Sequence, residues 1–269
     1  MMNGEGKWTQ MNVQVMGILN VTPDSFSDGG RYDTVQGAVE RAYELIEAGA
    51  DVLDIGAEST RPGYTPLDDE TEWSRLEPVL QALLPDIPVP ISIDTYHAST
   101  AERAMVLGVQ IINDISACGD PRMPQVLRRG TAQYVYMHNR THVDRTLGSK
   151  VFVEETRLGV ERLLDAGVES RRIIVDPGIG FAKTQEQNLG CMRDIDLFCD
   201  LGYPVLLGTS RKRVIGNALE VPVDERLEGT LATVAYGVLH GVRIVRVHDV
   251  KETVRVCRML EAICNVVTN

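Results

Sequence analysis

The sequence lacks any long apolar run, and this absence argues against a membrane protein. No segment among its 269 residues approaches the roughly 18 consecutive apolar residues of a membrane-spanning helix. The polar start, residues 1–10, also lacks the apolar stretch of a signal peptide. We therefore expect a cytoplasmic protein that has no membrane partner.

Paired cysteines are also missing. The chain has five cysteines, an odd number, and none of them forms a C-x-x-C motif. Neither a disulfide framework nor a structural zinc site is indicated by this pattern. We expect reduced thiols that serve mainly in packing.

Positive charge is scarce, with a formal net charge of −11 and a pI of about 5.0. Such a balance opposes binding to nucleic acid, which requires a basic surface. Small-molecule chemistry is favoured instead.

No low-complexity or Pro/Ser-rich linker divides the chain, and 43% of its residues are hydrophobic, enough for one substantial core. We expect a short N-terminal tail at 1–11 and a single domain at 12–269.

The motifs H-E-x-x-H, EF-hand and nucleophile elbow are absent, so neither a metal site built from protein ligands alone nor covalent Ser-His-Asp catalysis is predicted.

Eight short apolar runs, rich in Val and Ile, are present instead. Most are nearly continuous, as expected for parallel strands covered on both faces. The stretches between them have apolar residues at a helical period, most clearly after residue 34. We expect Thr34 to be the N-cap of that helix and Gly49 to end it. The sequence therefore predicts a (β/α)8 TIM barrel, with a doubly wound open sheet as the alternative. The runs are 13–20, 51–56, 89–94, 110–115, 133–138, 173–176, 205–209 and 244–248.

Three of these runs end in hydrogen-bond acceptors, namely Asp94, Asn113 and Asp176. In a barrel, the carboxyl ends of the strands meet at one mouth, which is where barrel enzymes place their active sites. Buried carboxylates need donors, and the edge of an amino-pyrimidinone supplies two parallel N–H groups. We predict a site for a flat heterocycle there; the alternative for each residue alone is a cap on the next helix.

Basic residues follow other strands: Arg61, Lys212, Arg246 and His248. Arg246 and His248 are two residues apart and so share one face of a strand, where inward charge requires a partner. A phosphate or diphosphate fits this requirement. A structural role is the alternative for His248 alone.

Asn20, with Asp24 or Asp28 nearby, could supply oxygen ligands to a Mg²⁺ ion that also binds the substrate phosphates.

Several ordered motifs together resemble the bacterial dihydropteroate synthases, and the resemblance extends over nearly the whole chain. The longest is Met-Gly-Ile-Leu-Asn-Val-Thr-Pro-Asp-Ser-Phe-Ser-Asp-Gly-Gly at 16–30. The others are Glu-Ser-Thr-Arg-Pro-Gly at 58–63, Ser-Ile-Asp-Thr at 92–95, Asn-Asp-Ile at 113–115, Asp-Pro-Gly-Ile-Gly-Phe at 176–181, Ser-Arg-Lys at 210–212 and Arg-Val-His-Asp at 246–249.

The resemblance implies an enzyme that joins a pterin methyl diphosphate to p-aminobenzoate and releases pyrophosphate. It implies a homodimer, a Mg²⁺ cofactor and a target of sulfonamide drugs. Its residue roles carry over as follows: Asn20 for the metal; Asp94, Asn113, Met137, Asp176 and Lys212 for the pterin; Thr60, Arg61, Arg246 and His248 for the diphosphate; Phe26, Pro62, Phe181, Lys212 and Arg213 for p-aminobenzoate; and Asp28, Arg61 and Lys212 for catalysis.

Two departures from the family pattern concern the rim of the site. Ala182 stands where Gly is frequent, so the loop is strained if this position needs a positive φ. Segment 139–149 lacks the Met-Gln-Gly sequence of many members.

The sequence leaves two alternative functions open: a pterin-dependent corrinoid methyltransferase domain, and a catalytically silent relative that binds pterins.

Overall fold

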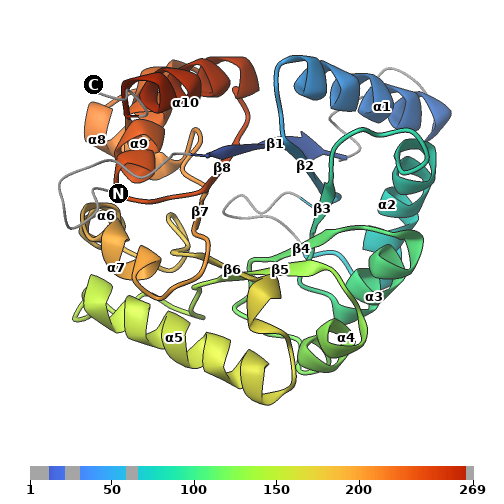
Figure 1. Ribbon diagram of the computed structural model, residues 1–269, viewed down its shortest axis with the longest axis horizontal. Coiled ribbons are helices and arrows are strands. Elements are labelled where there is room, and N and C mark those ends of the chain that lie inside the picture. Colours follow the sequence, from blue (N-terminus) through green and yellow to red (C-terminus); the bar gives the residue numbers. More distant parts are fainter. Residues whose placement is uncertain (1–11, 22–30, 59–65, 265–269) are drawn as a thin grey trace, which may run out of the picture.

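The computed structural model describes residues 12–21, 31–58 and 66–264, with the backbone alone at 31–34. Within these ranges eight parallel strands alternate with helices, and Figure 1 shows the strands as an inner ring with the helices around it. The strands are β1 (Gln14–Asn20), β2 (Val52–Gly56), β3 (Ile91–Asp94), β4 (Ile111–Asp114), β5 (Gln133–Met137), β6 (Ile173–Asp176), β7 (Leu206–Leu207) and β8 (Ile244–Val247). The α-helices are α1 (Arg31–Glu47), α2 (Asp69–Leu83), α3 (Ala98–Leu107), α4 (Met123–Arg129), α5 (Ser149–Asp165), α6 (Gln185–Arg193), α7 (Ile195–Cys199), α8 (Arg213–Leu219), α9 (Leu227–Leu239) and α10 (Val250–Cys264), and two 3-10 turns are η2 (Ser170–Arg172) and η3 (Val223–Glu225).

The strand order closes the sheet almost completely. Hydrogen-bonded neighbours follow the order β6-β5-β4-β3-β2-β1-β8-β7, and an isolated parallel bridge between Val175 and Val205 joins β6 to the chain entering β7. This arrangement is a single-domain (β/α)8 barrel, which confirms the predicted fold over the doubly wound sheet. The seventh strand is shorter than expected, since only Leu206–Leu207 forms a ladder.

Local signals fix the helix ends. Asp68 caps α2 by accepting a hydrogen bond from the Thr71 backbone N–H at 2.8 Å, and Thr184 with Gln187 forms a capping box on α6. Gly49 ends the first helix as expected, in a left-handed conformation with φ +102°. The prediction of Thr34 as N-cap was wrong, because the backbone is already helical from Arg31.

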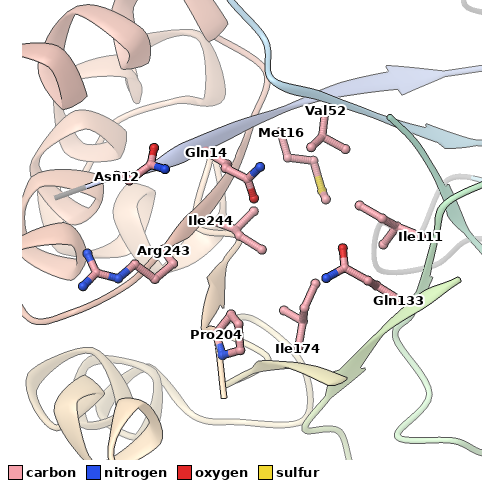
Figure 2. Close-up of a pocket in the computed structure, with 10 residues that line it drawn as sticks. All are labelled: Asn12, Gln14, Met16, Val52, Ile111, Gln133, Ile174, Pro204, Arg243 and Ile244. Carbon is pink, nitrogen blue, oxygen red and sulfur yellow. The ribbon is translucent and has the colours of Figure 1, made fainter. Parts of the chain in front are cut away.

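A separate apolar cluster fills the barrel interior below the carboxyl ends of the strands. One buried residue comes from each of seven strands: Met16, Val52, Ile111, Val135, Ile174, Leu206 and Ile244. In Figure 2 the side chains that point toward one another include Met16, Val52, Ile111, Ile174 and Ile244. At the amino ends of the strands they border a hollow of about 460 Å³. The Gln14 and Gln133 amides point into this hollow, whereas the Arg243 guanidinium is turned away.

Side chains along a strand alternate between its two faces, so residues two positions beyond this cluster also face the interior. Those positions carry the polar layer of the barrel, one step nearer the mouth. Of these seven positions Asp54, Asn113, Asp176 and Arg246 are polar, and Ile18, Met137 and Gly208 are not. Asp94 lies beside Asn113 in the β3–β4 register. The apolar cluster therefore acts as the floor of a polar site.

Candidate active site

Arg246 is the centre of the polar layer. Its Nε donates to Asp54 Oδ2 at 2.5 Å, and its Nη2 donates to Asp94 Oδ2 at 2.7 Å. Asn113 Nδ2 also donates to Asp54 Oδ2, at 3.2 Å. Four residues from β2, β3, β4 and β8 are thus joined in one network across the barrel. A guanidinium shared by two carboxylates is fixed in position by charge-assisted hydrogen bonds.

Asp54 was missed by sequence reasoning, although it lies within the predicted second strand. It is completely buried, and its Oδ1 has no hydrogen-bond partner among the described residues. A buried unpaired carboxylate oxygen is costly, so a ligand donor or an ordered water is expected there. The signal was the acidic residue inside an apolar run, in the sequence Val-Leu-Asp-Ile-Gly at 52–56.

The network shifts the pKa values of its members. Burial raises the pKa of Asp94 from 3.8 to about 7; Arg246 opposes this shift, and the Asp54 carboxylate adds to it. Burial tends to lower the pKa of Arg246, but Asp54 and Asp94 outweigh burial and raise it. The guanidinium therefore keeps its charge, while Asp94 can exchange a proton near neutral pH.

Asp176 and Lys212 form the opposite side of the mouth, around Gly208. A Cβ at Gly208 would lie 3.8 Å from Lys212 Nζ, 3.9 Å from Asp176 Oδ2 and 3.9 Å from Arg246 Cβ, so these three side chains converge there. Burial raises the pKa of Asp176, and Lys212 partly offsets the rise. Burial lowers the pKa of Lys212 to about 8, against the attraction of Asp176.

The loop after β6 brings Phe181 to Lys212. Lys212 Nζ donates to the Ile179 carbonyl at 2.6 Å and lies 4.6 Å from the centre of the Phe181 ring. The Gly178 backbone N–H donates to Asp176 Oδ1 at 2.7 Å. An apolar ring, an ammonium and a carboxylate are therefore neighbours at one point of the rim.

His248 lies at the end of β8, next to the turn that carries Ser210. Its Nδ1 lies 3.0 Å from Ser210 Oγ, and its backbone N–H donates to the same oxygen at 3.1 Å. The Ser210 hydroxyl can donate to Nδ1 while it accepts the backbone N–H, and the ring is then protonated at Nε2. The turn is held further by Arg211, which pairs with Asp249.

The remaining predicted residues divide into two groups. Met137 ends β5 and is buried, Arg213 begins α8, and Asn20 ends β1 beside Gly56 in register. These positions lie at the carboxyl ends of the strands, on the same side as the network. Other predicted residues lie outside the described residues: Asp24, Phe26, Asp28, Thr60, Arg61 and Pro62.

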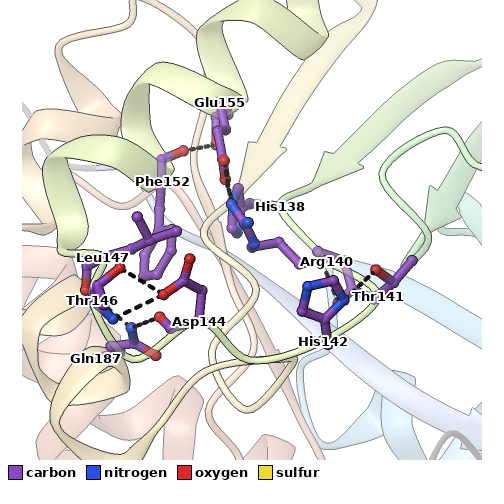
Figure 3. A network of polar contacts seen from close by, with 12 residues as sticks. His138, Arg140, Thr141, His142, Asp144, Thr146, Leu147, Phe152, Glu155 and Gln187 are labelled. Atoms are coloured by element: carbon purple, nitrogen blue, oxygen red, sulfur yellow. Dashed lines mark hydrogen bonds and ion pairs between the residues drawn. The ribbon is translucent and has the colours of Figure 1, made fainter.

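His138, left without a role by the sequence, belongs to a structural network on α5 that Figure 3 draws. Its Nε2 lies 2.8 Å from Glu155 Oε2, and Arg140 pairs with the same carboxylate. Burial lowers the pKa of His138 to about 4, so the ring is neutral at pH 7. Segment 139–149 is thereby attached to α5 through Arg140.

Three observations concern metal ligands, cysteines and membrane spans. No group of three or more His, Cys, Asp and Glu side chains within the described ranges could hold a metal ion. All five cysteines are free. No helix in the described part of the chain is long and apolar enough to cross a membrane.

The fold and the site define a class: a (β/α)8-barrel enzyme whose mouth combines buried carboxylates with cationic side chains. Comparisons with known proteins narrow the class. The pterin binding enzyme family matches residues 16–248. A dihydropteroate synthase from Bacillus subtilis is 48% identical over 252 residues, which cover 93% of this chain and 88% of that protein.

Solved structures agree with the sequence match. A dihydropteroate synthase from Clostridium difficile, crystallised in the presence of pteroic acid, superposes with a TM-score of 0.91 at 42% identity, covering 94% of this chain and 97% of that one. A Xanthomonas albilineans dihydropteroate synthase with 4-aminobenzoic acid gives 0.90 at 36% identity, covering 95% and 94%. The chain belongs to the dihydropteroate synthase family.

Proposed function

We infer that this chain catalyses the dihydropteroate synthase reaction. It condenses 6-hydroxymethyl-7,8-dihydropterin diphosphate with p-aminobenzoate, giving 7,8-dihydropteroate and pyrophosphate in folate biosynthesis. The observation that carries the inference is the buried layer in which Asp54, Asp94 and Asn113 meet Arg246, opposite Asp176 and Lys212. Its acceptors suit the N–H groups of a pterin, and its cations suit a departing diphosphate.

The pterin would lie flat on the apolar floor. Asp176, Asp94 and Asn113 would read its polar edge, with Met137 packed on the ring. Asp54 Oδ1 supports this pose, because it is a buried acceptor that lacks a donor among the described residues. Lys212, which lies beside Asp176, would donate to a ring acceptor on that side of the mouth.

The diphosphate would lie toward β8. Two donor groups of Arg246 are already engaged by Asp54 and Asp94, which leaves Nη1 for a phosphate oxygen. The Nε2–H tautomer of His248 would donate to the same anion. Thr60 and Arg61, outside the described residues, complete the predicted set.

p-Aminobenzoate would bind at the rim beside Phe181, Lys212 and Arg213, with Phe26 and Pro62 from outside the described residues. The aromatic amine is unprotonated at neutral pH, so its attack needs no strong general base. Sulfonamides resemble p-aminobenzoate and are expected to compete for this site.

Catalysis would consist of stabilising charge as the C–O bond to diphosphate breaks and the C–N bond forms. The cations would stabilise the leaving group, and the Asp94 and Asp176 carboxylates would stabilise the positive charge that develops on the pterin methylene. The remaining rate acceleration would come from holding the amine in position next to the pterin methylene. Arg61, Lys212 and Asp28 remain the predicted catalytic residues.

A Mg²⁺ ion fits the one amide oxygen that Asn20 offers at the end of β1. Mg²⁺ commonly takes one or two protein oxygens and fills its octahedron with water and substrate phosphates, so a larger cluster of protein ligands is not required. When bound, the ion would neutralise charge on the diphosphate.

Two further proposals concern the whole protein. A homodimer is supported by the family resemblance and by exposed apolar side chains on neighbouring helices α9 and α10, among them Leu239, Met259 and Ile263. Light scattering after size-exclusion chromatography tests the dimer.

A cytoplasmic location is supported by the five free thiols.

The function is tested by measuring pyrophosphate release with the pterin diphosphate alone, with p-aminobenzoate alone and with both. We expect release with both substrates, matched one to one by dihydropteroate. Pterin binding without this release would identify a catalytically silent relative and overturn the proposal.

A further inference from the structure

Lys183 is a buried lysine outside the substrate layer, and its side chain has an unusual set of partners. Its Nζ donates to three backbone carbonyls, those of Gly178 at 3.0 Å, Phe181 at 3.3 Å and His138 at 3.3 Å. Within the described residues it makes no ion pair with a carboxylate. Burial lowers its pKa to about 8, as expected for an ammonium removed from water.

The loop that Lys183 binds is tightly folded. Gly178, Gly180 and Ala182 have φ values of +65°, +90° and +40°, so every second residue is left-handed. A Cβ at Gly178 would lie 1.9 Å from the His138 carbonyl oxygen, which shows how closely the loop approaches the end of β5. Carbonyl groups that converge in this way repel one another unless a cation lies between them.

Two lysines hold this loop. Lys212 binds the Ile179 carbonyl at the mouth, whereas Lys183 lies toward α5, with its Nζ 5.2 Å from the centre of the Phe152 ring. Asn188 attaches the loop to α6 by accepting from the Gly180 N–H at 2.6 Å. Only Lys183 joins the loop to β5 through the His138 carbonyl, among the described contacts.

We propose that Lys183 is a positioning residue that sets the amine pocket, because it fixes the loop bearing Phe181 against the end of β5. Lys183 acts through the backbone and does not touch substrate. The proposal rests on the proposed function, since it gives Phe181 the role of a wall for p-aminobenzoate. Asp176 begins the same loop but is held independently by the β6 ladder, since the His138 N–H donates to its carbonyl at 2.8 Å.

The variant Lys183→Met tests the proposal, because it keeps most of the apolar stem and removes the three donors. We expect the KM for p-aminobenzoate to rise about tenfold or more, while the Kd of the pterin diphosphate stays within about twofold. Hydrogen exchange in the peptide spanning 177–184 should become faster. Lys183→Gln retains two donors and should give an intermediate KM. Lys251→Met, an exposed change on α10, is the matched control.

An unchanged KM for p-aminobenzoate in Lys183→Met would overturn the proposal, as would an equal loss of affinity for both substrates. If Lys183→Met fails to fold, Lys183→Gln decides between these outcomes. Failure of the proposed function is distinguishable, because the unmodified protein would then produce no dihydropteroate before any variant is compared.

Discussion

Asp54 shows at the scale of one residue how the site is preorganised. It accepts hydrogen bonds from Arg246 and Asn113 while it is itself completely buried. Removing one partner of a buried ion pair leaves an uncompensated charge, which is why such changes are strongly destabilising. Asp54 therefore holds in place Arg246 and Asn113, the two side chains that we propose contact the substrate.

We predict that Asp54→Asn lowers the free energy of unfolding by about 2 kcal/mol and weakens pterin binding, because Arg246 loses one of its two carboxylates. Urea unfolding and calorimetry measure the two effects. Asp86→Asn, an exposed change after α2, should alter neither. Wild-type stability in Asp54→Asn would show that the Arg246–Asp54 pair does not support the folded site.

Asp94 should make stability depend on pH. Its pKa is about 7 in the folded protein and near 3.8 when exposed, so the folded state holds the proton more tightly. Between about pH 4 and pH 7 the folded state binds more protons than the unfolded state, and the contribution of this group to stability therefore falls as pH rises. We expect urea unfolding of Asp94→Asn to depend less steeply on pH across this range than that of the wild type. Parallel curves for the two proteins would contradict the raised pKa.

At the scale of the element, the loop after β6 stores strain at Ala182. Its φ of +40° lies in the left-handed region, where a residue with a side chain is disfavoured relative to Gly. The positive φ considered for this position from the sequence is therefore present, and Ala182 carries the resulting strain.

We predict that Ala182→Gly changes the melting temperature little or raises it by a few degrees, since relief of about 1 kcal/mol of strain offsets the added freedom of the unfolded chain. Ala182→Val should lower it clearly, because a β-branched residue tolerates a positive φ poorly. Thermal unfolding of both variants checks the ranking. Equal melting temperatures for Gly and Val would mean that the loop adopts another backbone conformation.

At the scale of the whole molecule, apolar runs and their period were enough to predict eight strands, the barrel and the polar strand ends at Asp94, Asn113 and Asp176. The pairing of Arg246 with Asp54 could not be predicted, because the two residues are 192 positions apart and meet only when the barrel closes. The apolar pattern also could not predict the length of β7, since the hydrogen bonds that define a strand depend on its neighbouring strands. Sequence therefore predicts which side chains face the interior, and the closed sheet decides which of them are partners.

The central claim is that the polar layer above the apolar floor binds the edge of a pterin. Calorimetric titration of the wild type and Asp176→Asn with the pterin diphosphate tests it most directly, because the amide keeps the shape of the side chain but offers donors where a carboxylate accepted hydrogen bonds. We predict a loss of roughly 2 to 4 kcal/mol of binding free energy in the variant. Equal affinity for the two proteins would contradict the account and remove Asp176 from the site.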